Sequence, residues 1–100
     1  MDEHPDLSSE ARVSTAAPSR YLAQLCKHFQ HKLPVTLAED RGRIEFPGGV
    51  CALEAGSGTL VLRLTAGDEA ALARLEDVVA RHPLRFAFRE KPEVQWTRPS

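Results

Sequence analysis

The feature that most constrains the fold is an alternation of apolar and polar side chains between residues 35 and 65. Successive side chains of a strand point to opposite faces, and short turns containing glycine join antiparallel strands. The pattern therefore predicts a four-stranded antiparallel meander, with glycine-containing turns between its strands. The expected strands are 35–38, 43–47, 50–55 and 59–65.

The register of this meander follows from its turns. With Gly48-Gly49 as a two-residue hairpin loop, which permits positive φ at both positions, Phe46 is expected opposite Cys51. Ser57-Gly58 in the next turn sets Cys51 opposite Leu64. One face is then apolar and consists of Val35, Leu37, Ile44, Phe46, Cys51, Leu53, Leu62 and Leu64. The other, solvated face carries Thr36, Arg43, Glu45, Ala52, Glu54, Val61, Arg63 and Thr65.

One helix is expected before this meander in the sequence and one after it. Pro18 suits a first helical position, and Pro34 is expected to end the first helix after residue 33. Its apolar stripe is Leu22, Leu25, Cys26, Phe29 and Leu33. Asp68 caps the second helix, which Pro83 is expected to end. Its apolar stripe is Leu72, Leu75, Val78 and Val79.

The remaining segments complete a two-layer α+β fold. A short strand is expected at 11–15 and an edge strand near Val94 and Trp96, whereas 84–88 is ambiguous between an extended segment and a helical turn. The predicted order is strand, helix, four strands, helix, strand: an antiparallel sheet of four to six strands with both helices on one face. This order resembles the TATA-binding-protein-like and helix-grip topologies. Residues 11–97 form the single domain, between a disordered segment, 1–10, and a tail, 98–100.

Composition argues against several partners. The 100 residues carry a net charge of -1, so nucleic acid and anionic membranes exert no overall attraction. No apolar run approaches the roughly 20 residues of a membrane span. The polar start lacks the pattern of a secretory signal, so we expect a cytoplasmic protein. Cys26 and Cys51 both point to the predicted core. A reducing cytoplasm favours two reduced, buried thiols, and a disulfide between them is the alternative.

The densest group of reactive side chains lies on the first helix. Cys26 lies roughly 160° from His28 around the helix at about 100° per residue, so the two do not form a catalytic pair or a metal site. His28 and His31 share a flank but have no third ligand fixed nearby. Tyr21, His28 and Lys32, with His31, form a basic flank that suits an acidic small molecule or an acidic partner. We expect no catalytic residues, metal or cofactor.

Several phrases of the sequence resemble a known family. They are SRYLAQLCKHFQHKLP, GRIEFPGGVCALEA, ALARLEDVVARH and RFAFRE, and the resemblance to the bacterial domain of unknown function 2218 covers residues 11–97. Similar domains are found joined to flavin-dependent siderophore-interacting proteins. The resemblance therefore implies a binding or accessory domain in iron or siderophore handling, with such a protein as a partner.

Two alternatives to a small-molecule binding domain stay open at this point. One is a homodimeric or partner-binding module that uses an exposed edge strand, either that of Val13 or that of Trp96. The other, less expected, is an enzyme that depends on a thiol or a histidine. The sequence is compatible with a monomer or a homodimer.

Overall fold

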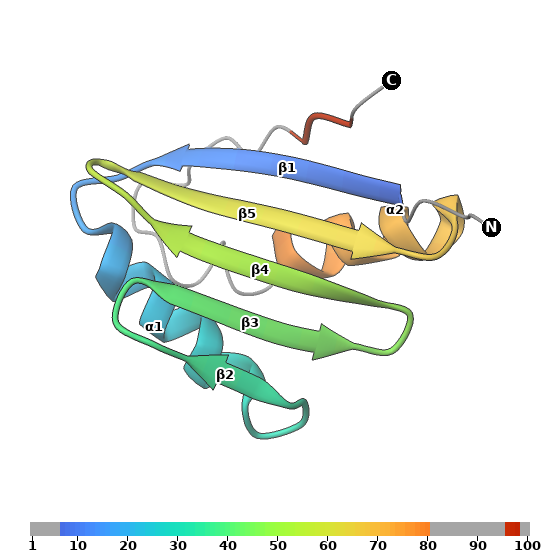
Figure 1. Cartoon of the computed structure of the whole chain (residues 1–100), viewed down its shortest axis with the longest axis horizontal. Helices are drawn as coiled ribbons and strands as arrows, with labels where there is room; N and C mark the ends of the chain where they lie inside the picture. Colours follow the sequence, from blue (N-terminus) through green and yellow to red (C-terminus); the bar gives the residue numbers. More distant parts are fainter. Residues whose placement is uncertain (1–6, 81–95, 99–100) are drawn as a thin grey trace, which may run out of the picture.

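The computed structural model describes residues 7–80 and 96–98, which form a two-layer α+β fold (Figure 1). Its elements are β1 (Leu7–Ser14), α1 (Pro18–Phe29), β2 (Val35–Leu37), β3 (Arg41–Phe46), β4 (Gly49–Ala55), β5 (Thr59–Ala66) and α2 (Glu69–Val79). All strand pairs are antiparallel, in the order β1-β5-β4-β3-β2. The predicted fold class is therefore confirmed. No helix of the described residues is long and apolar enough to cross a membrane.

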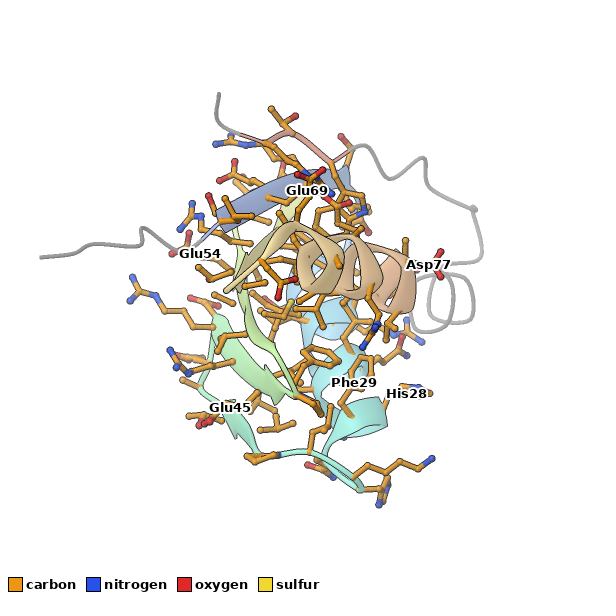
Figure 2. The ribbon with its side chains drawn as sticks, turned by 90° about the vertical axis from the view of Figure 1, so that its right-hand side faces the viewer. His28, Phe29, Glu45, Glu54, Glu69 and Asp77 are labelled. Atoms are coloured by element: carbon orange, nitrogen blue, oxygen red, sulfur yellow. The ribbon has the colours of Figure 1, made fainter. Side chains whose placement is uncertain are left out.

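Both helices pack on the same face of the sheet. The helix α1 contacts β2, β3, β4 and β5, and α2 contacts β1, β4 and β5. Figure 2 shows the two helices on one side of the sheet and the labelled Glu45 and Glu54 on the other. The core between the layers consists of Val13, Leu22, Leu25, Cys26, Ile44, Cys51, Leu53, Leu60, Leu62, Leu64, Ala66, Leu72, Leu75 and Val79.

The register of the first hairpin differs from the expected one by two residues. Phe46 pairs with Gly49, so the loop is Pro47-Gly48, and Ile44 rather than Phe46 lies opposite Cys51. Gly48 alone of the two glycines has a positive φ, of 92°. Because the difference is an even number of residues, every side chain keeps its predicted face. The second register is confirmed, since Cys51 lies opposite Leu64.

The third strand begins earlier than predicted. Gly42 was expected in a turn but lies inside β3, where it is buried. A Cβ atom at this position would lie 2.6 Å from Sγ of Cys26. Gly42 therefore lets α1 approach the sheet, with the thiol of Cys26 in the space of the missing side chain.

The first helix ends four residues before the predicted end. It begins at Pro18 as expected, but its last helical residue is Phe29 rather than residue 33. The carbonyl of Phe29 accepts hydrogen bonds from the backbone N–H groups of Lys32 (3.0 Å) and Leu33 (2.9 Å), which turn the chain towards β2. Leu33 still packs against the edge of the core.

The first strand is longer than predicted. Leu7–Ser14 pairs with β5 along its whole length, and Ser9, Ala11 and Val13 are buried. The prediction of a disordered segment is therefore wrong for residues 7–10, whose alternating burial continues the strand pattern. Residues 1–6 lie outside the described part of the chain.

The described C-terminal residues attach to β1 and α2. Thr97 and Glu10 exchange two backbone hydrogen bonds, of 2.9 and 2.8 Å. The guanidinium of Arg98 donates two hydrogen bonds to Glu76, which also accepts one from the hydroxyl of Ser9. The prediction of a tail is therefore wrong for Arg98. Val94, Pro83 and the ambiguous segment 84–88 lie outside the described residues.

The second helix follows the prediction at its start. The carboxylate of Asp68 accepts a hydrogen bond of 2.8 Å from the backbone N–H of Ala71, as expected of an N-cap. Leu72, Leu75 and Val79 are buried. Val78, which was expected in the same stripe, is only half-buried.

Substituting Gly42 by alanine tests the close approach of α1. The added methyl group would overlap Sγ of Cys26, so we expect Gly42→Ala to lower the free energy of unfolding by about 1–3 kcal/mol. Cys26→Ala should reduce this cost in the double variant, because it removes the sulfur atom. Urea denaturation of the four proteins measures the coupling. Gly67→Ala, which adds a methyl group to open space, is the control. Purely additive effects of the two substitutions would contradict the proposed packing.

The ion pair between Glu76 and Arg98 predicts a dependence of stability on pH. Hydrogen bonds from Arg98, and secondarily from Ser9, hold the pKa of Glu76 below its ordinary value. The stability that Glu76 contributes is complete above the unfolded-state pKa of about 4.3 and is lost as pH falls through the lower, folded-state pKa. We therefore expect Glu76→Gln to be less stable than the wild type at about pH 7, with a gap that narrows towards about pH 3. Urea denaturation at both pH values measures the gap, and an equal gap would contradict the ion pair. Glu39→Gln is the exposed control.

Candidate functional site

His28, His31 and Lys32 surround one hollow at the C-terminal end of α1. Phe29 and Val78 complete its lining, and its volume is about 520 Å³. We call this site the helix-end hollow. Three of the four residues predicted to bind a ligand therefore come together. Figure 2 shows His28 and Phe29 on the helical side of the molecule.

The end of α1 explains why these three side chains meet. His28 lies in the last turn of the helix, whereas His31 and Lys32 lie in the turn that follows it. The expectation that they share one continuous helical flank is thus wrong. The hydrogen bonds from the Lys32 and Leu33 N–H groups to the Phe29 carbonyl fold the chain back beside the helix instead.

Phe29 forms an apolar wall of the helix-end hollow. Its ring makes edge-to-face contacts with His28 and with Phe46, with 5.0 Å between ring centroids in both pairs. Val78 contributes the second apolar side chain, from α2. The exposed side chains of His28, His31 and Lys32 supply nitrogen donors around this apolar wall. The hollow therefore offers one apolar and one polar side to a ligand.

Tyr21 is separate from this group. It lies one helical turn before Leu25, is half-buried against the hydrophobic core, and does not line the helix-end hollow. A helical spacing of seven residues from His28 was the basis for grouping them. The helix ends too soon after His28 for the remaining residues to continue that line.

The two cysteines are buried in the core, as predicted. Both are free thiols, Cys26 on α1 and Cys51 on β4. Burial raises the pKa of both, and for Cys51 burial and the neighbouring Cys26 raise the pKa to about 12. A thiol held in its protonated form is a poor nucleophile and a poor metal ligand. Within residues 7–80 and 96–98, no three His, Cys, Asp or Glu side chains gather as a metal site.

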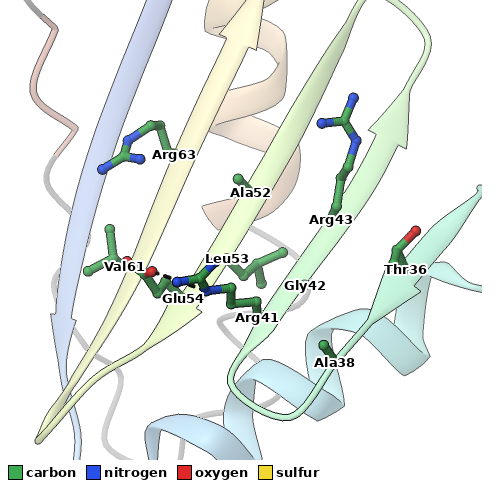
Figure 3. A pocket seen from close by; sticks show the side chains of 10 residues that line it. All are labelled: Thr36, Ala38, Arg41, Gly42, Arg43, Ala52, Leu53, Glu54, Val61 and Arg63. Carbon is green, nitrogen blue, oxygen red and sulfur yellow. Dashed lines mark ion pairs between the residues drawn. The ribbon is translucent and has the colours of Figure 1, made fainter.

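A second hollow lies on the face of the sheet that the helices leave uncovered (Figure 3). Its volume is about 440 Å³, and we call it the sheet hollow. Its lining residues are Thr36, Ala38, Arg41, Gly42, Arg43, Ala52, Leu53, Glu54, Val61 and Arg63. The sequence placed six of these on the solvated face without predicting a site. Finding it required the correct register of β3 against β4, which decides what lies beside each arginine.

Comparison with known proteins identifies the family. The profile of a bacterial family, described as "Uncharacterized protein conserved in bacteria (DUF2218)", matches residues 10–97. The chain belongs to this family. Among solved structures, the chain is similar to PA4090 from Pseudomonas aeruginosa, determined by NMR, with a TM-score of 0.75 and 37% sequence identity. That similarity covers 91% of this chain and 95% of PA4090, so the DUF2218 fold is shared over nearly the whole domain. No curated protein matches the chain.

The burial of Cys26 and Cys51 predicts that neither thiol reacts in the folded protein. We expect an aromatic disulfide reagent to modify both in urea and neither under native conditions, because both are buried and the pKa of both is raised. The Cys26→Ala and Cys51→Ala variants assign each reacting thiol. Rapid modification of Cys26 in the native state would contradict this account and would revive a thiol-dependent enzyme.

Proposed function

We propose that this DUF2218 domain is a binding or accessory domain in iron or siderophore handling, and that it holds an acidic small molecule in the helix-end hollow. The observation that carries the proposal is the arrangement of His28, His31 and Lys32 around one apolar-walled hollow. Lys32 contributes an ammonium group with three donors, and each imidazole contributes a ring N–H. Such groups bind carboxylate, phenolate or hydroxamate oxygens by charge-assisted hydrogen bonds.

The C-terminal end of a helix carries a negative partial charge, which opposes the binding of an anion. In α1, backbone N–H groups already donate hydrogen bonds to some of the carbonyl groups at this end. The carbonyl of Cys26 accepts from the N–H of Gln30 at 3.0 Å, and that of Phe29 accepts from two further N–H groups. Lys27 and His28 lie in the last turn of α1, where positive charge complements the helix dipole. Lys32 lies beyond the end of the helix and lines the hollow. In this proposal its ammonium group binds the acidic ligand.

The size and lining of the helix-end hollow suit a small organic ligand. Small-molecule sites typically enclose 300–1,000 Å³, and about 520 Å³ lies within that range. Phe29 and Val78 would contact the carbon framework while the nitrogen groups bind its oxygens. A ferric siderophore combines these two characters, because iron-binding oxygens are held on an organic framework. The resemblance to domains joined to siderophore-interacting proteins supports the same ligand class and suggests a flavin-dependent siderophore-interacting protein as the partner.

Titration with gallium(III) complexes tests this proposal without paramagnetic broadening. We expect Ga(III) tricatecholate or Ga(III) citrate to shift the amide resonances of His28, His31, Lys32 and Val78. Lys32→Ala should weaken binding roughly tenfold, because it removes a charged donor. Lys27→Ala is the matched control, since Lys27 is an exposed lysine in the last turn of α1 that does not line the hollow. Unshifted resonances at these positions, or equal losses in both variants, would refute the proposal.

A further inference from the structure

The sheet hollow lies on a face that carries many arginines. Within the described chain, both helices pack on the opposite face, so the side chains of this face point to solvent. Its arginines are Arg12, Arg41, Arg43 and Arg63. Three of these line the sheet hollow together with a single carboxylate, Glu54. The charged lining therefore has an excess of positive charge.

Most of these arginines already have carboxylate partners. Glu10 forms ion pairs with Arg63 at 2.9 Å and with Arg12 at 3.0 Å. These hydrogen bonds, that of Arg63 first, lower the pKa of Glu10 and keep it ionised. Arg41 lies 3.5 Å from Glu54, and Figure 3 shows this pair at one end of the hollow.

Arg43 differs from the other arginines. It forms no ion pair with any residue that the structure describes, although Glu45 and Glu54 lie on the same face. It is exposed, and its cross-strand neighbours are Thr36 and Ala52. Its guanidinium therefore keeps its charge and all five donors for an external partner.

The register places Arg43 and Arg63 on either side of a small residue. Ala52 of β4 pairs with Arg43 on one side and with Arg63 on the other. Figure 3 shows the two arginines flanking Ala52. Their strands are separated by two strand spacings, roughly 10 Å. Because an alanine methyl group fills little of the space between two long side chains, the hollow forms above Ala52, with Val61 as a further apolar contact.

We infer that the sheet hollow binds a small, flat organic molecule that carries two acidic groups. Guanidinium groups bind carboxylate and phosphate groups in bidentate fashion and stack on planar surfaces. Arg43 would hold one acidic group, and Arg63 the other through Nη1, which its hydrogen bonds to Glu10 from Nε and Nη2 leave unused. The flat body would lie over Ala52 and Val61. A single-stranded nucleic acid fits less well, because the described residues of this face include no aromatic side chain for base stacking. This site is independent of the helix-end hollow, and either can exist without the other.

Isophthalate tests this inference, since it is a flat molecule with two carboxylates. We expect it to shift the amide resonances of Arg43, Ala52, Val61 and Arg63. Benzoate, with one carboxylate, should bind roughly tenfold more weakly, and neutral isophthalamide should not bind. High salt should weaken the binding, because the site is exposed. Shifts confined to the helix-end hollow would overturn this inference while leaving the proposed function intact.

Two substitutions separate the charge of the site from its shape. Arg43→Ala should weaken isophthalate binding about tenfold through the loss of one guanidinium. Ala52→Leu should abolish it by filling the hollow without a change of charge. The matched controls are Thr65→Leu, on the same face but outside the hollow, and Arg20→Ala on α1; both should bind as the wild type does. Binding that survives Ala52→Leu, or that Arg20→Ala weakens equally, would show general attraction to positive charge and overturn the inference.

Discussion

The contact between Cys26 and Gly42 sets how closely α1 lies against the sheet. A side chain at residue 42 would collide with the thiol, so the pairing of a glycine in β3 with a small residue on the helix brings the two layers together. Leu22 and Leu25 of the same helix are then fully buried over the strands. The position of α1 on the sheet in turn determines where its C-terminal end lies. It therefore determines where His28, His31 and Lys32 meet beside Val78 of α2.

The helices cover one face of the sheet and leave the other face exposed. A two-layer fold leaves one face of its sheet to solvent unless a partner covers it, and this chain populates that face with arginines and glutamates. Exposed ion pairs of this kind add little stability, each about 0–1 kcal/mol. Their main effect here is on charge distribution. Glu54 balances Arg41, the single carboxylate of Glu10 is shared by Arg12 and Arg63, and Arg43 has no ion pair with a described residue. An exposed arginine beside a hollow is better suited to recognition than to folding.

The sequence predicted the faces of the strands more reliably than their ends. Alternation decides which side chains share a face, and that assignment survived even where the hairpin loop moved from Gly48-Gly49 to Pro47-Gly48. The moved loop mattered for the site, however. A loop at Gly48-Gly49 would set Arg43 opposite Glu54, whereas the observed loop sets Arg41 there and leaves Arg43 opposite Ala52. The error of two residues in register therefore misplaced Arg43 relative to Glu54 and Ala52, so the sheet hollow was not predicted.

Helix ends were harder to predict because tertiary contacts decide them. Pro34 is compatible with a helix up to residue 33, but backbone hydrogen bonds to Phe29 begin the turn earlier and redirect the chain into β2. Three of the predicted ligand-binding residues still meet, through a turn rather than a helical flank, and Tyr21 does not join them. The N-terminal strand was underestimated because its first half, Leu7–Glu10, contains a single large apolar residue. Pairing with β5 supplies the order that local sequence does not indicate.

The most direct test is to measure which protein protons lie close to the protons of a bound ligand. Nuclear Overhauser effects between a bound Ga(III) tricatecholate and the protein report contacts atom by atom. We expect effects to the ring protons of Phe29 and the methyl groups of Val78, which form the apolar wall of the helix-end hollow. Effects confined to Val61 and Ala52 on the open sheet face, with none to Phe29 or Val78, would contradict this expectation.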